Sequence, residues 1–171
     1  MINKKDNVDS LYKDLNSSDI KKRIKAVNRM VEMKEKGVEK NLIKLLYDES
    51  WHLRNYVAKV LSGFGKDIIP PLLEETKEGI WYVRDAVCKT LGYIADIDCL
   101  DPLVSFLEDS SERVKLTAEK ALMLIINKDR VTFVESYLSK KDADFQELIM
   151  EKLRKIDTGL YKDIVDENSY N

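Results

Sequence analysis

The stretch that decides the fold is WYVRDAVCKTLG at residues 81–92, because residues 51–62 read WHLRNYVAKVLS in the same register. Trp81 matches Trp51 and Arg84 matches Arg54, each at a spacing of 30 residues. Two columns carry this register through the chain: Arg23, Arg54, Arg84, Lys115 and Gln146, and three residues later Ala26, Val57, Val87, Ala118 and Ile149. Recurrence at a fixed period of roughly 20 to 50 residues indicates a repeat architecture. The sequence therefore predicts about five copies of one unit.

Each copy is predicted to form two helices. In the first half of one copy, Val83, Val87 and Leu91 recur at a spacing that places them on one helix face. A break follows, and a proline then opens the second stretch, at Pro70 in one copy and Pro102 in the next. Proline suits the first turn of a helix, where its missing N–H would have had no partner. Each copy is therefore expected to be a helix hairpin.

A single hairpin cannot bury both of its apolar stripes, so neighbouring copies must stack to form one continuous core. The predicted fold class is all-α: a right-handed α-α superhelix, or α-solenoid, of about five helix pairs with an amino-terminal cap helix at residues 8–15. We expect one domain over residues 1–167 and a disordered tail at 168–171. The repeats are expected at about 16–46, 47–76, 77–107, 108–138 and 139–167.

The sequences DESWHLRNYVAKVLSGFG and GIWYVRDAVCKTLGYIADIDCLDPL carry a family resemblance. They resemble HEAT repeats of the short kind found in phycobilisome-lyase-type proteins, over about residues 15–155. The resemblance implies a HEAT-like solenoid in a family that consists mostly of binding scaffolds, with a few enzymes. It also implies that a basic residue and a preceding acidic residue help to tie successive repeats together. The matching pairs are Arg54 with Asp48, Arg84 with Glu78, and Lys115 with Asp109, and Ser17 holds the acidic position of the first repeat.

The sequence favours a protein that is no enzyme and that needs no metal or cofactor. His52 is the only histidine, whereas the di-iron sites of HEAT-repeat deoxyhypusine hydroxylases need several His-Glu pairs. The two cysteines, Cys88 and Cys99, lack the spacing of a zinc site, and we expect both to be structural. A bilin-lyase-like enzyme or lyase subunit stays open as an alternative, because that activity has no short sequence motif whose absence could exclude it.

The charge balance argues against a nucleic-acid partner, which is kept only as a second alternative. The chain holds 29 Lys and Arg against 31 Asp and Glu, with a pI near 5.6, whereas phosphate-binding domains are usually basic. The first residues, MINKKDNVDS, lack the apolar core of a signal peptide and no apolar run is long enough for a membrane span, so the expected location is the cytoplasm.

We expect the partner to be another protein or a peptide, bound on the concave surface made by the second helices. Equivalent positions there are polar and varied: Lys40, Pro70, Asp101 and Thr132 in one row, and Lys44, Glu74, Ser105 and Ser136 in the next. The intervening column stays apolar, which is expected of a core-facing stripe: Leu42, Leu72, Leu103 and Val134. The candidate binding residues are Lys40, Lys44, Glu74, Asp101, Ser105 and Tyr82.

A basic face on the first helix of the first predicted repeat is the competing surface. Residues 1–46 hold 12 Lys and Arg against 7 Asp and Glu, and Lys21, Lys25 and Arg29 share one helix face. This face is either solvated, or a docking patch for an acidic partner or for the acidic end of another copy.

The tryptophans are assigned to the core. Trp51 and Trp81 are expected to cover the seams between repeats, while Tyr47, Tyr56 and Tyr82 lie more exposed and form an aromatic edge suited to binding.

Overall fold

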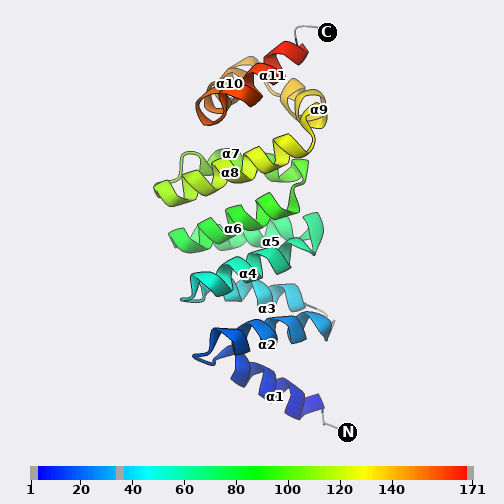
Figure 1. Ribbon diagram of the computed structural model, residues 1–171, viewed down its shortest axis with the longest axis vertical. Coiled ribbons are helices and arrows are strands. Elements are labelled where there is room, and N and C mark those ends of the chain that lie inside the picture. The colour runs from blue at the N-terminus through cyan, green and yellow to red at the C-terminus, as the bar shows by residue number, and fades with distance from the viewer. Residues whose placement is uncertain (1–3, 34–36, 169–171) are drawn as a thin grey trace. The chain divides into compact units, whose positions relative to one another are not determined.

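The computed structural model describes residues 4–33 and 37–168, and within these ranges the chain is all-helical with no strand (Figure 1). Helix α1 (Lys4–Leu15) precedes five helix pairs in the described part of the chain, so the all-α repeat fold is confirmed. The predicted cap helix at 8–15 lies within α1. The first helices of the pairs are α2 (Ile20–Glu32), α4 (Trp51–Ser62), α6 (Trp81–Ile94), α8 (Glu112–Lys128) and α10 (Ala143–Ile156).

The second helices are shorter, and most are built from segments of different helical type. The first two are α3 (Val38–Lys44) with the 3-10 turn η1 (Leu45–Tyr47), and η2 (Gly65–Ile68), α5 (Ile69–Glu74) and η3 (Glu75–Glu78). The next two are η4 (Ile97–Cys99) with α7 (Leu100–Phe106), and α9 (Arg130–Thr132) with the π-helical η5 (Phe133–Tyr137) and the 3-10 turn η6 (Leu138–Lys140). The last is α11 (Thr158–Asn168). Of the predicted disordered tail, Asn168 ends α11 and residues 169–171 lie outside the described residues.

Local sequence explains how the second helices begin and end. Pro70 lies in the first turn of α5, where proline costs no hydrogen bond. Gly79, after η3, has a φ of 74°, a left-handed conformation that glycine adopts without steric cost. This glycine lets the chain reverse direction before α6 begins at Trp81.

The chain divides into two compact units, Met1–Thr90 and Leu91–Asn171, with the division inside α6. Each unit is described by itself. The prediction of one domain over residues 1–167, with its repeat boundaries, stays a prediction.

The first unit buries the predicted apolar stripes. Leu53, Val57 and Leu61 of α4 have no exposed surface, and neither do Leu42 of α3 and Leu72 of α5. Complete burial of a side chain of this size stabilises a fold by about 1.5–3 kcal/mol. Because the buried residues alternate between first and second helices, each helix pair contributes both of its stripes to one core.

The second unit is packed in the same way. Leu91, Leu103, Val114 and Ile164 are fully buried. Of the predicted core-facing column, Leu103 is therefore in the core, whereas Val134 is only half-buried, because it lies in the π-helical turn. Gly92 lies against α8, because a Cβ built there would stand 2.8 Å from the Cβ of Ala121. A larger residue at position 92 would push α6 and α8 apart.

Candidate functional site

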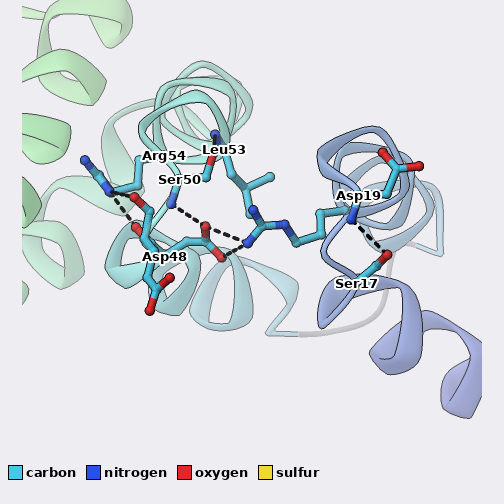
Figure 2. A network of polar contacts seen from close by, with 8 residues as sticks. Ser17, Asp19, Asp48, Ser50, Leu53 and Arg54 are labelled. Carbon is cyan, nitrogen blue, oxygen red and sulfur yellow. Dashed lines mark hydrogen bonds and ion pairs between the residues drawn. The ribbon is translucent and has the colours of Figure 1, made fainter.

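Successive first helices of the first unit are joined by a polar network around Asp48 (Figure 2). The Asp48 carboxylate accepts Arg23 Nη1 at 2.6 and 2.8 Å, and it also accepts the backbone N–H of Ser50 at 2.8 Å. Arg54 Nη1 donates to the carbonyl oxygens of Asp48 and Glu49, at 2.5 and 2.9 Å. The contact differs from the predicted pair: Arg54 binds the backbone, while the Asp48 carboxylate binds the arginine of the preceding repeat.

The same turn also starts the next helix. Ser50 is the N-cap of α4, and its Oγ accepts the N–H of Leu53. In the first repeat, Ser17 Oγ takes the role of the aspartate and accepts the N–H of Asp19, the N-cap of α2, at 3.2 Å (Figure 2). The turn before a first helix therefore caps that helix. Where the turn holds an aspartate and the preceding repeat holds an arginine, the turn also joins the two repeats.

The basic column behaves differently in the second unit. Lys115 pairs with Glu112 of its own helix at 2.8 Å, and the hydrogen bond to Glu112 is the main cause of its raised pKa. Asp109, its predicted partner, accepts the N–H of Ser111 at 2.8 Å and acts on Lys115 through its charge. In the first unit, Arg84 is half-buried, and the side chain of its predicted partner Glu78 is not among those that the structure describes.

The assignment of the tryptophans to the core is wrong. Trp51 is 58% exposed and Trp81 is 48% exposed. Each is the first residue of its helix, and side chains there project back toward the N-terminal end, beyond the seam that the next turn covers. The seam is filled instead by Leu53 and Val83, two residues further on, which have no exposed surface.

These tryptophans belong to an aromatic edge in the first unit. Trp51 stacks on His52 with ring centroids 3.7 Å apart, and Trp81 meets Tyr82 edge to face at 5.9 Å. The Arg54 guanidinium lies 4.6 Å from the centroid of the Tyr82 ring, which connects α4 with α6. Tyr82 is therefore half-buried under an arginine, and the exposed aromatic surface is that of the tryptophans.

The candidate binding residues of the first unit lie on its second helices, apart from Tyr82. Lys40, Lys44 and Glu74 are exposed, as the sequence predicts. Glu74 pairs with Lys77 at 2.6 Å, whereas neither Lys40 nor Lys44 has a side-chain ion pair among the described residues.

In the second unit, the predicted rows converge on an open groove of about 550 Å³. Asp101, Thr132 and Ser136, which come from two successive second helices, line it together. Ile97, Asp98, Tyr137 and Lys140 complete the lining. The remaining candidate, Ser105, is exposed but donates its hydroxyl to the carbonyl oxygen of Pro102 at 2.7 Å and does not line this groove.

One wall of the groove is held by a network that sequence reasoning missed. Asp101 Oδ1 accepts both the Tyr137 hydroxyl at 2.7 Å and Lys141 Nζ at 2.6 Å. The Lys141 ammonium also lies 4.7 and 5.0 Å from the ring centroids of Tyr137 and Phe145. Asp101 is therefore more than a solvated groove residue, because it joins α7 to the π-helical turn and to the segment between η6 and α10.

The ionisation of this network follows from its surroundings. Burial alone would raise the pKa of Asp101, but the hydrogen bonds from Lys141 and Tyr137 outweigh it, so the pKa lies below its usual value. Burial, together with the Asp101 carboxylate, raises the pKa of Tyr137 far above its usual value. At neutral pH the pair is therefore a carboxylate and a neutral phenol.

Potential metal ligands and the two cysteine thiols are the remaining features of the described residues. Residues 4–33 and 37–168 hold no group of three or more His, Cys, Asp and Glu that could bind a metal ion. Cys88 and Cys99 are buried free thiols, and burial raises the pKa of Cys99 to about 11, so that this thiol stays protonated. None of the helices in the same ranges is both long and apolar enough to cross a membrane.

Comparison with known proteins agrees with this architecture. The family model for HEAT repeats matches residues 69–154, which run from α5 into α10 and cover half of the chain. A search of curated proteins gives no match. The groove, the network around Asp101 and much of the core of the second unit lie within the matched range. The chain therefore belongs to the HEAT-repeat family.

Proposed function

We propose that this protein is a non-enzymatic scaffold that binds a partner protein or peptide along the surface of its second helices. HEAT repeats generally mediate protein–protein interactions. The observation that carries the proposal is the groove of the second unit, where Asp101 and Thr132 occupy equivalent positions in successive repeats and Ser136 lies one turn beyond Thr132. A surface built from equivalent positions suits an extended or helical segment, because the segment meets a similar wall in each repeat.

The groove is both polar and firmly supported. Thr132 and Ser136 present hydroxyl groups, and Asp98 and Lys140 present charges, all of which can pair with a peptide backbone or polar side chains. The Asp101–Tyr137–Lys141 network holds its walls in place before a partner arrives. A preformed wall lowers the entropic cost of binding.

The distribution of charge along the chain supports one orientation of the bound partner. The first unit holds 18 Lys and Arg against 14 Asp and Glu, and the second holds 11 against 17. We therefore propose that acidic residues of the partner lie near Lys40 and Lys44, and that basic residues lie near the groove of the second unit. Charge complementarity of this kind sets orientation and association rate more than affinity.

The proposal is tested with one groove variant and one matched control. Ser136→Arg fills the groove, whereas Ser139→Arg introduces the same side chain at an exposed position outside it. Affinity purification from the native cell should identify proteins that wild type and Ser139→Arg retain and Ser136→Arg loses. Thermal unfolding of both variants provides the folding control.

The competing surface is tested in the same experiment. Lys21 and Lys25 are exposed on α2, and Arg29 pairs with Asp14 of α1 at 2.9 Å. If Ser136→Arg retains the partner and Lys21→Glu with Lys25→Glu loses it, the partner binds the outer basic face and the proposed groove is wrong.

A further inference from the structure

A second pocket of the unit at 91–171 lies where two first helices end, and it has a volume of about 220 Å³. Its rim is formed by the residues that follow α6 and end α8: Ala95, Asp96, Lys128 and Asp129. It shares Ile97 and Thr132 with the groove of about 550 Å³, so the two cavities adjoin. A segment lying in the groove can therefore reach this pocket with one side chain.

The rim is electronegative for two independent reasons. α6 has 14 residues and α8 has 17, and both end here, so each contributes the partial negative charge of a helix C-terminus. Asp96 and Asp129 add two carboxylates. Hydrogen bonds from the hydroxyl and the N–H of Thr132 lower the pKa of Asp129, so this group is ionised at neutral pH.

Both carboxylates keep acceptor sites for a ligand. Asp96 Oδ1 accepts the N–H of Asp98 at 3.0 Å, and Asp129 accepts the N–H and hydroxyl of Thr132 at 3.0 and 2.7 Å. A carboxylate offers about four lone-pair sites, so these contacts fix its position without exhausting it.

The chain itself already places a cation in this pocket. Lys128 Nζ donates to the carbonyl oxygen of Ala95 at 3.0 Å, just past the end of α6. Ala95 has a φ of 51°, a left-handed conformation that is uncommon for a residue with a Cβ. The one cationic side chain on the rim is thus drawn to the negative end of the neighbouring helix.

The floor of the pocket is apolar. It is formed by Ile97, Leu100, Ile125 and Phe133, of which Leu100 is fully buried and Phe133 is 2% exposed. An apolar floor below an acidic rim fits a long aliphatic chain that ends in a positive charge. Arginine fits better than lysine, because its planar guanidinium can donate to two carboxylates at once.

We propose that this pocket receives an arginine side chain of the partner segment that occupies the adjoining groove. The proposal rests on the proposed function, and it adds the chemical identity of one contact. The aliphatic part of the arginine lies on Ile97 and Ile125, and its guanidinium reaches Asp96 and Asp129. An anionic side chain would be repelled by those carboxylates. A purely apolar side chain would remove water from them without replacing its hydrogen bonds.

The first test uses two small compounds of the same shape. N-acetyl-arginine methylamide and N-acetyl-citrulline methylamide differ in the charge of the side-chain head group. Titrated into the full-length protein and followed by NMR, the arginine compound should shift the amide signals of Ala95, Asp96 and Thr132. Citrulline should bind about fivefold more weakly, the loss expected for one partly exposed charge interaction. Equal shifts from both compounds would overturn the assignment.

Two variants and a control sharpen the result. Asp96→Asn with Asp129→Asn removes both charges but keeps the capping oxygens, so arginine binding should weaken about tenfold while the fold is retained. Asp144→Asn with Glu147→Gln removes two exposed carboxylates of α10 and should leave binding unchanged. Lys128→Met removes the internal competitor and should tighten binding. Weaker or unchanged binding to Lys128→Met would contradict the proposal.

The two proposals fail separately. If the arginine compound does not bind while Ser136→Arg still loses the partner, the pocket assignment is wrong and the proposed function stands. If the compound binds at Ala95 and Asp96 while Ser136→Arg retains the partner, the cation pocket stands and the proposed groove is wrong.

Discussion

The two units of this protein are built from the same helix pair but differ in the surface that they expose. In the unit at 1–90, Tyr56 bonds to Asn28 at 2.5 Å and Lys89 bonds to Asn55 at 2.7 Å between first helices. Arg23 of α2 binds Asp48 in the turn before α4, and Tyr47 bonds to Glu75 at 2.8 Å between second helices. In the unit at 91–171, Tyr137 and Lys141 bind Asp101, Lys152 binds Glu108, and Arg130 binds Asp163. Lys128 of α8 also donates to the carbonyl oxygen of Ala95 after α6.

The difference shows where each unit leaves surface for other molecules. The first unit exposes two tryptophans at the amino ends of its first helices α4 and α6. The second unit has an open groove along its second helices, and an adjoining pocket lies beside the ends of α6 and α8. The same repeat therefore supports two kinds of surface: exposed aromatic rings at the starts of first helices in one unit, and a polar groove along second helices in the other.

The largest expected effect concerns the apolar core of the second unit. Leu91, the first residue of the second unit, has no exposed surface, so Leu91→Ala should lower the free energy of unfolding by about 2–5 kcal/mol. Leu116→Ala, at a leucine of α8 that is 50% exposed, is the control and should change it by less than about 0.5 kcal/mol. Chemical denaturation measures both. A loss below about 1 kcal/mol for Leu91→Ala would contradict the packing of this column.

The next effect tests the network of the first unit. Asp48→Ala leaves the Arg23 guanidinium and the N–H of Ser50 without their acceptor, and the Asp48 and Arg23 side chains are only 16% and 17% exposed. The variant should therefore lose about 1–3 kcal/mol of stability. Asp67→Ala, at an exposed aspartate of η2, is the matched control. If both variants unfold at the same denaturant concentration, Asp48 does not tie the repeats energetically.

These two predictions show what the sequence can predict and what it cannot. The repeat period and the buried column were readable because burial of Leu53, Val57 and Leu91 imposes a regular spacing on the sequence. The exposure of Trp51 and Trp81 could not be predicted in this way. Periodicity assigns a residue to a helix face, but it does not say whether the end of the helix extends beyond the neighbouring repeat.

The groove was only partly predictable, for a related reason. Asp101, Thr132 and Ser136 followed from the register, since equivalent positions of stacked repeats face the same side. The π-helical turn from Phe133 to Tyr137 departs from the 3.6-residue period, so a periodic pattern in the sequence does not predict it. Its consequence, the Tyr137 hydroxyl bound to Asp101 across 36 residues, depends on tertiary packing.

A smaller effect is expected from the network of the second unit, and it depends on pH. The pKa of Asp101 in the folded protein lies below its value in the unfolded chain, which is about 3.9. Its contribution to stability is therefore present above about pH 3.9 and is lost as the pH falls through the folded pKa. Because the side chain is 62% exposed, the contribution should stay below about 1 kcal/mol.

The measurement compares wild type with Asp101→Asn by urea denaturation between about pH 6 and pH 2.5. The difference in stability should be constant at the higher pH values and should shrink below about pH 4. Glu147→Gln, at an exposed glutamate of α10, serves as the control and should give no such trend. A difference that is constant over the whole range would mean that the Asp101 charge contributes nothing to folding.

The smallest effect on stability is expected at the aromatic edge of the first unit. Trp51→Ala and Trp81→Ala should each change the free energy of unfolding by less than about 0.5 kcal/mol, because both rings project from helix ends into solvent. Acrylamide should quench the fluorescence of the folded protein efficiently, since these are its two tryptophans and both are about half exposed. Val83→Ala, two residues after Trp81 and fully buried, is the matched comparison and should cost clearly more. If the tryptophans are shielded from acrylamide and their replacement by alanine is strongly destabilising, both rings are packed in the core, and the first unit has no exposed aromatic edge to set against the second unit.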